Sequence, residues 1–395
     1  MCIRDSYKEK RLLVKANVAS LTDLELAKKY HFDGIGLFRI EQIYMANNNL
    51  PSQGELYKIL AKMLTGWEDK EIIIRLLDIG GDKILPYFEK DNLEYNVLGL
   101  RGIRFLKEHP QLLEDQLTVF LRLSAIFKKL KILIPLVSLP EDIKIVKNFL
   151  KKIKTKLKKE QLPFNEKISL GAMIETPASL FFLAEILKQV DFINIGTNDL
   201  IQYIMVADRE KVKLTNYYEA GHKLVIDIIK NSDIKLVFYS SDYIFDGKNG
   251  PYSENDTPNP LSNYGKAKLE SEHNIINNLN DYLIIRTTVV YGYERNRKNF
   301  VYRLIDTVNS GKIIKVPKDQ IGTPTYVEDL SIATLKLIIN NKNGIYNVVG
   351  PELVSRYQFS LIAADIFNLD KNLIKPVLTS ELNQKAPRPL KAGLK

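Results

Sequence analysis

Two groups of residues in this 395-residue chain could do chemistry. In the first group, Glu175 and Asp199 each follow a short apolar run that predicts a strand. Two carboxylates at strand ends can hold Mg²⁺, which prefers oxygen ligands, and the neighbouring Asn198 adds an amide donor for phosphate. Arg39 and Arg75 lie at equivalent positions, and guanidinium groups suit phosphate and carboxylate oxygens. The set predicts a site for a small, strongly anionic phosphate ester; the alternative is a scatter of surface ion pairs.

The second group predicts hydride-transfer chemistry. Tyr264 and Lys268 are four residues apart, which places them on one face of a helix, where an ammonium group can make a phenol more acidic. Such a phenol can donate and accept a proton near neutral pH. Ser241, at the end of a predicted strand, is suited to hydrogen-bond a substrate carbonyl or hydroxyl. The alternative is chance, because a Tyr-x-x-x-Lys pair arises easily in a chain with 20 tyrosines.

Alternating strands and helices must position the first group. Apolar runs, each followed by a segment of helix length, predict strands at residues 12–18, 34–38, 72–77, 132–137, 169–174 and 192–195. Regular alternation of this kind predicts parallel strands with crossover helices. Runs without inward and outward alternation suit strands buried on both faces, as in a barrel, whose active sites lie at the carboxyl ends of the strands. The fold class is therefore α/β.

A second α/β region begins near residue 217. It has predicted strands at 235–239 and 282–286, a turn-rich loop over 246–263, and a helix from Tyr264 towards Asn277. Arg286 has no role that spacing alone assigns. Because 395 residues exceed the ~250–300 at which one core usually stops growing, we expect two domains, 10–210 and 211–395, with no spacer between them. Residues 1–9 fit neither pattern, and we expect a terminal scar or a disordered segment.

Charge and composition narrow the function classes. Much of the net charge of +10 lies in lysine-rich runs such as residues 147–159, where apolar residues recur at helical spacing and lysines fill the other face. We interpret this run as a solvated helix face; without interleaved aromatics it does not predict a nucleic-acid partner. Cys2 is the only cysteine, so no intrachain disulfide can form. No apolar run approaches the ~20 residues of a membrane span. We expect a cytoplasmic protein with no membrane partner.

Five motifs surround the first group: GIGLFRIEQIYM at 34–45, RLLDIGGDK at 75–83, LGLRGIR at 98–104, GAMIETPA at 171–178 and IGTNDLIQY at 195–203. Over residues 10–210 the chain closely resembles the phosphoenolpyruvate-binding barrel of enzyme I of the sugar phosphotransferase system. The resemblance implies an incomplete (β/α)₈ TIM-type barrel, about six of eight strands long. It also implies that Glu175 and Asp199 bind Mg²⁺, and that phosphoenolpyruvate is contacted by Arg39, Arg75, Asn198 and Arg209.

In that family the phosphoryl group passes to a histidine on a separate domain. The contexts of the four histidines of this chain are unlike the family's phosphohistidine segment. We therefore expect a phosphocarrier protein as partner only together with the family's other domains, and no phosphoryl transfer to protein by this chain alone.

Four further motifs surround the second group: LVFYSSDYIFDG at 236–247, PNPLSNYGKAKLE at 258–270, RTTVVYG at 286–292 and GTPTYVEDL at 322–330. They resemble extended short-chain dehydrogenases, nearest to the dTDP-4-dehydrorhamnose reductase group. The resemblance implies a nucleotide-sugar substrate and NAD(P)H, with Ser241 polarising the substrate, Tyr264 as general acid, and Lys268 tuning Tyr264 and contacting the cofactor. A dinucleotide fold needs a glycine-rich turn, but the sequence has no Gly-x-Gly-x-x-Gly, so we expect an incomplete Rossmann-like domain that binds NAD(P)H poorly.

Three functional readings follow. The first is a phosphoenolpyruvate-using phosphotransferase barrel with an unrelated tail, and the second is a sugar-nucleotide reductase with an unrelated head. The third is a non-functional chimeric chain made of two fragments. For activity, we expect the non-functional chimeric chain. For the family to which the chain is most similar, we expect the phosphoenolpyruvate-using phosphotransferase. An open barrel would expose strand edges and apolar surface, so we also expect either poor solubility or a homo-oligomer.

Overall fold

The computed structural model describes residues 6–7, 10–11, 13–46, 49–80, 99–207, 226, 235–294, 297–382, 384 and 386–395. Contacts divide the chain into two compact units, residues 13–210 and residues 211–395 together with 3–12. We call them the N-terminal unit and the C-terminal unit. Of the segment 1–9, the structure describes only β1 (Ser6–Tyr7), which pairs antiparallel with β2 (Lys10–Arg11).

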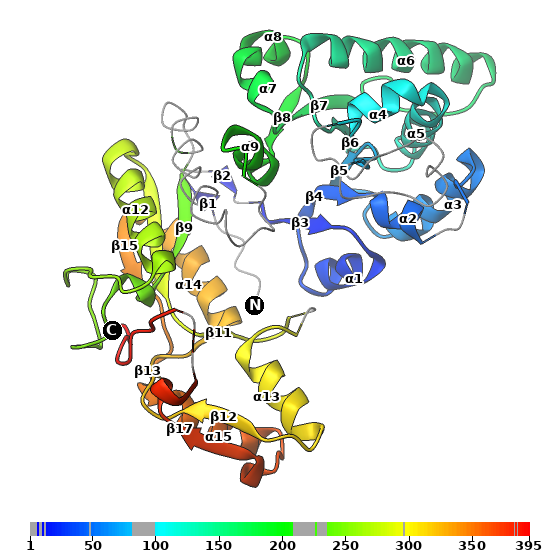
Figure 1. The fold of residues 1–395 in the computed structure, drawn as a ribbon. Coiled ribbons are helices and arrows are strands. Elements are labelled where there is room, and N and C mark those ends of the chain that lie inside the picture. The colour runs from blue at the N-terminus through cyan, green and yellow to red at the C-terminus, as the bar shows by residue number, and fades with distance from the viewer. Residues whose placement is uncertain are drawn as a thin grey trace. The chain divides into compact units, whose positions relative to one another are not determined.

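The N-terminal unit is built on one parallel sheet of six strands in chain order. They are β3 (Lys15–Val18), β4 (Gly34–Arg39), β5 (Glu71–Arg75), β6 (Leu130–Ile134), β7 (Ser169–Ile174) and β8 (Phe192–Ile195). Each pairs in parallel with the next strand along the chain. The predicted parallel α/β arrangement is confirmed, and the sheet curls as half a barrel would (Figure 1).

Nine described helices accompany this sheet. They are α1 (Leu21–Lys29), α2 (Glu41–Met45), α3 (Gln53–Leu64), α4 (Ile103–Glu108), α5 (Pro110–Leu123), α6 (Pro140–Lys159), α7 (Pro177–Phe181), α8 (Leu183–Leu187) and α9 (Thr197–Ile204). Local signals set several starts: Ser52 caps α3 in a capping box with Glu55, and Pro140 opens α6, where a proline sacrifices no helical hydrogen bond.

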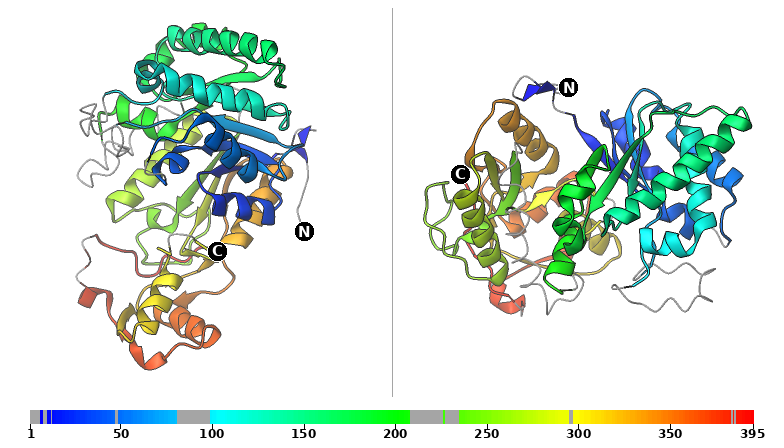
Figure 2. Two further views of the ribbon diagram at one scale, coloured as in Figure 1. Left: turned by 90° about the vertical axis from the view of Figure 1, so that its right-hand side faces the viewer. Right: turned by 90° about the horizontal axis from the view of Figure 1, so that it is seen from above.

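The core of the N-terminal unit lies between the sheet and its helices. Ile72 and Ile74 of β5 pack into the large apolar cluster with the helices, whereas Ile73 joins a smaller cluster on the other face. Successive side chains of a strand point to opposite faces, so β5 is buried on both. Burial on both faces explains the apolar runs in the sequence. The helices α3, α4, α5 and α6 cover the outer face of the sheet (Figures 1 and 2).

Strand ends differ from the predicted ranges by a few residues. The strand predicted at 132–137 ends at Ile134, because Pro135 follows and Leu136 has a φ of 54°, which takes the backbone out of the extended region. The strand predicted at 12–18 begins at Lys15, after the exposed Leu13 and Val14.

The C-terminal unit has a three-stranded parallel sheet in the order β15-β10-β9, in which β15 is Gly344–Asn347. The predicted strands are β9 (Leu236–Ser241) and β10 (Tyr282–Thr287), and the predicted helix is α12 (Asn263–Asn278). Ile284 packs with Ile275 of α12, whereas Leu283 and Ile285 pack with Leu330 of α14 (Val327–Ile339). Alternate residues of β10 thus face helices on the two sides of the sheet.

The remaining elements of this unit are shorter. They are η3 (Asp242–Ile244), β11 (Val290–Tyr291), α13 (Phe300–Asn309), β12 (Ile314–Pro317), β13 (Ile321–Gly322), β14 (Thr325–Tyr326), α14 (Val327–Ile339), β15 (Gly344–Asn347), β16 (Val354–Ser355), α15 (Arg356–Ile366), η4 (Lys371–Leu373), β17 (Ile374–Val377) and η5 (Thr379–Leu382). A separate apolar cluster joins α13 and α15 to β12 and β17. Among the residues that the structure describes, no helix has both the length and the apolar character needed to cross a bilayer.

Candidate functional site

The residues of the first predicted group lie at one edge of the six-stranded sheet. Arg39 and Arg75 are the last residues of β4 and β5 and are paired in the strand register. Glu175 directly follows β7, and Asp199 lies in the first turn of α9, which follows β8. Because the strands are parallel, their carboxyl ends share this edge. The structure brings these four side chains to the same side of the unit.

Arg75 sits in a buried ionic cluster. Its Nη2 donates to Glu41 Oε1 over 2.8 Å, and its Nη1 lies 3.1 Å from Asp78 Oδ2. Both carboxylates are buried, Asp78 completely. Burial alone would lower the pKa of Arg75, but the charges of Asp78 and Glu41 outweigh it and raise that pKa, so the guanidinium stays charged.

Arg101 extends the cluster to Asp199. It donates from Nε and Nη2 to the two oxygens of Asp78, each over 3.0 Å. It also donates from Nη1 and Nη2 to the two oxygens of Asp199, over 3.2 and 3.1 Å, and from Nη1 to the Tyr203 hydroxyl over 3.3 Å. The sequence pattern assigns no role to Arg101 or Asp78. The one sequence feature that could have pointed to them is that Arg101 lies in the motif at 98–104 and Asp78 in the motif at 75–83.

Glu175 is held tightly in its position. Its side chain is buried, and Oε1 accepts a hydrogen bond from the backbone N–H of Leu136 over 2.6 Å. A Cβ at position 196 would lie 2.6 Å from Glu175 Oε2. Only glycine allows α9 to begin this close to the carboxylate.

The electrostatics of Glu175 differ from those of its neighbours. Burial and the nearby Asp78 raise the pKa of Glu175 to about 7, although the charge of Arg75 opposes them and Asp199 adds to the rise. The acidic side of the cluster thus carries negative charge that the two arginines do not fully compensate. A further cation beside Glu175 would compensate this negative charge and favour the ionised form of Glu175.

The donor set fits a hard divalent cation. Glu175 and Asp199 offer carboxylate oxygens, and Mg²⁺ commonly uses one or two carboxylates with water and substrate phosphate in its other positions. Within the described part of the chain, no group of three or more histidine, cysteine, aspartate or glutamate side chains has the arrangement of a metal site. The candidate protein ligands for Mg²⁺ are Glu175 and Asp199, and Asp199 is also bonded by Arg101.

The arginines leave donors for an anion. The Nε atoms of Arg39 and Arg75 are buried and have no hydrogen-bond partner among the residues that the structure describes. An unpaired buried donor is costly, and a ligand oxygen would relieve that cost. Asn198, beside Asp199, is exposed. Arg209, the remaining predicted contact, lies outside the described residues.

The second predicted group gathers where β9 ends. Ser241, the last residue of β9, donates from its hydroxyl to Asp242 Oδ1 over 2.9 Å and accepts from the backbone N–H of Tyr243 over 3.2 Å. Tyr264 and Lys268 follow the cap residue Ser262 on α12. The rings of Tyr243 and Tyr264 meet edge to face, with centroids 5.7 Å apart. The structure thus places α12 beside the Ser241 segment.

Lys268 has two kinds of neighbour. Its Nζ donates to the carbonyl of Tyr239 over 2.9 Å and lies 5.9 Å from the centroid of the Tyr264 ring. Tyr264 is 46% exposed. The helical spacing of four residues therefore does bring the ammonium group close to the phenol ring.

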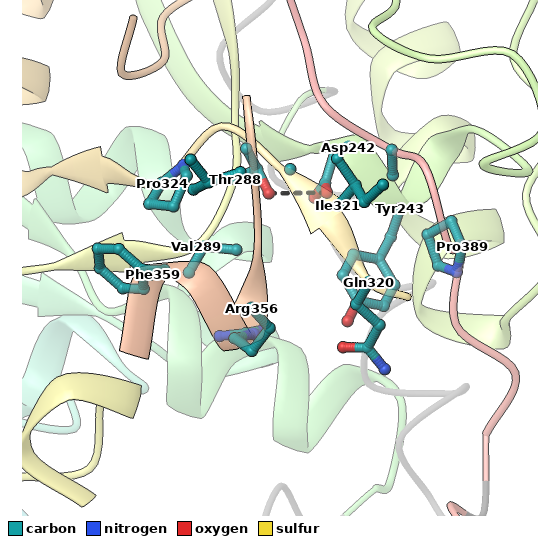
Figure 3. A pocket seen from close by; sticks show the side chains of 13 residues that line it. Asp242, Tyr243, Thr288, Val289, Gln320, Ile321, Pro324, Arg356, Phe359 and Pro389 are labelled. Atoms are coloured by element: carbon teal, nitrogen blue, oxygen red, sulfur yellow. Dashed lines mark hydrogen bonds between the residues drawn. The ribbon is translucent and has the colours of Figure 1, made fainter. Parts of the chain in front are cut away.

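A small cavity of about 40 Å³ lies beside this group. Figure 3 shows Asp242, Thr288 and Arg356 among its lining side chains, with the Thr288 hydroxyl donating to Asp242 Oδ2 over 2.7 Å. Burial raises the pKa of Asp242 to about 6, although its hydrogen bonds to Thr288 and Ser241 oppose the rise. Burial also lowers the pKa of Arg356. Asp242 lies within the motif at 236–247, but the sequence pattern assigns no role to it.

Arg286 has a structural position that spacing did not assign. Its Nη2 and Nε donate to the Glu272 carboxylate over 2.7 and 3.1 Å, and its Nη1 donates to the carbonyl of Glu254 over 3.1 Å. Both charged side chains are buried. The pair joins β10 to α12 and so holds the helix that carries Tyr264 and Lys268.

The N-terminal unit is thus an α/β unit of parallel strands whose carboxyl ends carry arginines and carboxylates. The chain belongs to the family of PEP-utilising enzymes through their PEP-binding domain, whose family model matches residues 4–235. A second family model, the RmlD substrate binding domain, matches residues 205–395. Both resemblances inferred from the motifs are confirmed.

Curated relatives match the N-terminal part. The phosphoenolpyruvate-protein phosphotransferase of Buchnera aphidicola subsp. Schizaphis graminum is 40% identical over 217 residues, which cover 55% of this chain and 38% of that protein. Multiphosphoryl transfer protein 2 of Escherichia coli is 38% identical over 210 residues, 53% of this chain and 25% of that protein. The chain therefore spans well under half the length of the curated relatives it matches.

Solved structures similar to this chain include dTDP-4-dehydrorhamnose reductases. The protein from Clostridium acetobutylicum has 25% identity and a TM-score of 0.45, covering 62% of this chain and 86% of that one. The protein from Bacillus anthracis, solved in complex with NADP, has 24% identity and a TM-score of 0.41, covering 57% of this chain and 90% of that one.

Proposed function

We propose that the N-terminal unit binds phosphoenolpyruvate together with Mg²⁺ at the carboxyl edge of its sheet, which we interpret as part of a (β/α)₈-type barrel. The observation that carries this proposal is the pair Arg39 and Arg75, neighbours in the register, whose buried Nε donors have no partner within the described part of the chain. A small molecule with a phosphate and a carboxylate offers the anionic oxygens that such donors require. The family of the unit supports the same ligand.

Each residue has a proposed role. Arg39, Arg75, Asn198 and Arg209 would hold the anionic groups of phosphoenolpyruvate, and Glu175 and Asp199 would hold Mg²⁺. A bound Mg²⁺ would supply neutralisation of the phosphate charge. Arg101 would keep Asp199 in place by its two hydrogen bonds, because a carboxylate fixed from one side presents its remaining lone pairs in a defined direction.

The proposed function of this unit is the binding of its ligand. The chain matches 38% of the length of its Buchnera relative, so the proposal concerns this unit and its ligand and not the activity of the whole relative.

The test is calorimetric titration of the full chain with phosphoenolpyruvate in the presence of Mg²⁺. Arg39→Gln is the informative variant, because Arg39 is only partly buried and forms no ion pair among the described residues, so the fold should survive. Arg122→Gln is the matched control, since Arg122 is also partly buried but stacks over Tyr57 on the helical side of the unit. We expect loss of binding in Arg39→Gln alone. Equal binding by both variants would contradict the assigned site.

A second function is supported in the C-terminal unit. The proximity of Lys268 to the Tyr264 ring favours a reductase-type site with Ser241, in which NAD(P)H would donate a hydride to a nucleotide sugar. Tyr264 would protonate the substrate oxygen and Ser241 would hold it, while Lys268 would hold Tyr264 and the cofactor ribose. The match to the RmlD substrate binding domain supports the nucleotide sugar as ligand.

Thermal unfolding of the full chain with NADH, NADPH or dTDP tests this second function. A ligand that binds only the folded protein raises the melting temperature. We expect dTDP to do so and the dinucleotides to have a smaller effect, since the sequence has no glycine-rich turn. A melting temperature unmoved by all three, with no binding of phosphoenolpyruvate, would favour the chimeric, non-functional reading.

A further inference from the structure

A lysine-lined cavity lies on the N-terminal unit, outside the candidate site at the carboxyl ends of its strands. Its volume is about 450 Å³, and one wall is α6, which contributes Lys147, Lys151, Lys154 and Lys158. The spacings of four, three and four residues place these lysines on one face of the helix. The run that the sequence predicts to be a solvated helix face is therefore in part the wall of a cavity.

The cavity is remote from the carboxyl edge of the sheet. Its lining includes Ile168 and Leu170 at the amino end of β7, whereas Glu175 follows the carboxyl end of that strand. A strand rises ~3.3 Å per residue, so the length of β7 separates the two places. The floor of the cavity is apolar, since Leu150, Ile168 and Leu170 are all buried.

The opposite wall compensates only part of the positive charge. Lys154 Nζ donates to the carbonyl of Glu166 over 2.7 Å, and Lys158 pairs with the Glu166 carboxylate over 2.7 Å. Asp191 accepts a hydrogen bond from the backbone N–H of Leu170 over 2.8 Å. Four lysines thus face two carboxylates, Glu166 and Asp191, among the lining residues.

Lys147 and Lys151 carry the uncompensated charge. Both are exposed, and neither has an ion pair among the described residues. Like charges four residues apart on a helix repel each other. An anion between them would relieve this repulsion and would be accepted by two ammonium groups.

We propose that this cavity binds a small phosphorylated metabolite, with its phosphate between Lys147 and Lys151 and its carbon skeleton over the apolar floor. A phosphate dianion matches the excess of two positive charges. Gln189 and Asp191 on the opposite wall can bond hydroxyl groups of the ligand. No aromatic side chain lines the cavity, so it lacks the stacking surface of a single-stranded nucleic-acid site.

Calorimetric titration of the full chain with glycerol 3-phosphate, in the presence of EDTA, tests the proposal. EDTA removes divalent cations and with them the metal-dependent site. Lys147→Gln/Lys151→Gln removes the two free cations. Lys152→Gln/Lys156→Gln is the matched control, because it removes two exposed lysines at the same spacing from the same helix, outside the cavity lining.

We expect the affinity to fall roughly tenfold or more in the first double variant, because charged hydrogen bonds to phosphate are lost, and to stay unchanged in the control. Far-ultraviolet circular dichroism should show both variants folded, since all four lysines are exposed. Equal weakening in both variants would indicate bulk charge and overturn the proposal, as would the lack of millimolar binding by the unaltered chain. Loss of binding in Arg39→Gln would place the ligand at the carboxyl edge and also overturn it.

Discussion

The buried carboxyl groups of the two predicted sites are bonded by different kinds of partner. In the N-terminal unit, charges pair with charges: Arg75 and Arg101 bridge Glu41, Asp78 and Asp199. In the C-terminal unit, the carboxyl group of Asp242 is bonded by hydroxyl groups of Ser241 and Thr288. The charges of Glu41 and Asp78 keep Arg75 charged, whereas burial raises the pKa of Asp242 although two hydroxyl groups bond it, so that its protonation depends on pH.

This difference has a consequence for how each site responds to change. In a buried ionic cluster, removal of one member leaves the others charged and unpaired, which costs far more than the pair itself contributes. Around a carboxyl bonded by hydroxyls, the carboxyl can become neutral instead. The first site should therefore fail abruptly on substitution, and the second should respond gradually to pH.

The largest effect is expected from Arg101→Leu. The substitution leaves Asp78 and Asp199 without their shared cation, and we expect the free energy of unfolding of the N-terminal unit to fall by about 3–5 kcal/mol. Urea unfolding followed by Trp67 fluorescence measures it, because the only tryptophan of the chain is fully buried in this unit. Arg122→Leu is the control. A loss no greater than that of the control would show that the cluster is not a coupled network.

A smaller effect is expected from Glu272→Leu in the C-terminal unit. The substitution leaves one buried cation, Arg286, without its carboxylate, and we expect a loss of about 3 kcal/mol. The double variant Glu272→Leu/Arg286→Met should recover much of that loss, because no unpaired charge remains. Urea unfolding followed by far-ultraviolet circular dichroism gives the coupling energy. If the double variant were as unstable as the sum of its single variants, the pair would not be an isolated ion pair.

The strands could be predicted from the sequence, but the ionic partners could not. Runs such as Ile72-Ile73-Ile74 are apolar because both faces of the sheet are covered, so their position in the chain indicates the strand directly. Parallel pairing then predicts that Arg39 and Arg75 share an edge. The contact of Arg101 with Asp199 joins residues 98 positions apart, and no local pattern reports a contact at that separation.

The C-terminal unit was harder to predict for a related reason. The spacing of Tyr264 and Lys268 is a local signal, and the helix that carries them runs within one residue of the predicted range at each end. The burial of Asp242 depends on Thr288 and on the wall of the cavity, which come from distant parts of the chain. An aspartate after a strand is more often solvated, so its sequence context gave no sign of burial.

A pH-dependent effect should report the buried carboxyl group of Asp242 in the C-terminal unit. The pKa of Asp242 is raised to about 6 in the folded protein from its ordinary value of 3.8. The contribution of a raised carboxyl pKa is fully present below the unfolded value and is lost as pH rises through the folded value. We expect wild type to lose roughly 2–3 kcal/mol between pH 4 and pH 6 relative to Asp242→Asn. Urea unfolding of both proteins across this range measures it, and parallel pH profiles would contradict the buried carboxyl.

The smallest effect compares one tyrosine from each region. The Tyr203 hydroxyl accepts a hydrogen bond from Arg101 over 3.3 Å inside the ionic cluster, so Tyr203→Phe should cost about 1 kcal/mol. Tyr264 is 46% exposed, and Tyr264→Phe should change stability by less than ~0.5 kcal/mol. Urea unfolding gives both values, followed by Trp67 fluorescence for Tyr203→Phe and by far-ultraviolet circular dichroism for Tyr264→Phe. The expected difference rests on exposure, because substitutions at exposed positions usually change stability little. If Tyr264→Phe cost as much as Tyr203→Phe, its hydroxyl would be a structural group, and the proposed role of Tyr264 as general acid would lose its basis.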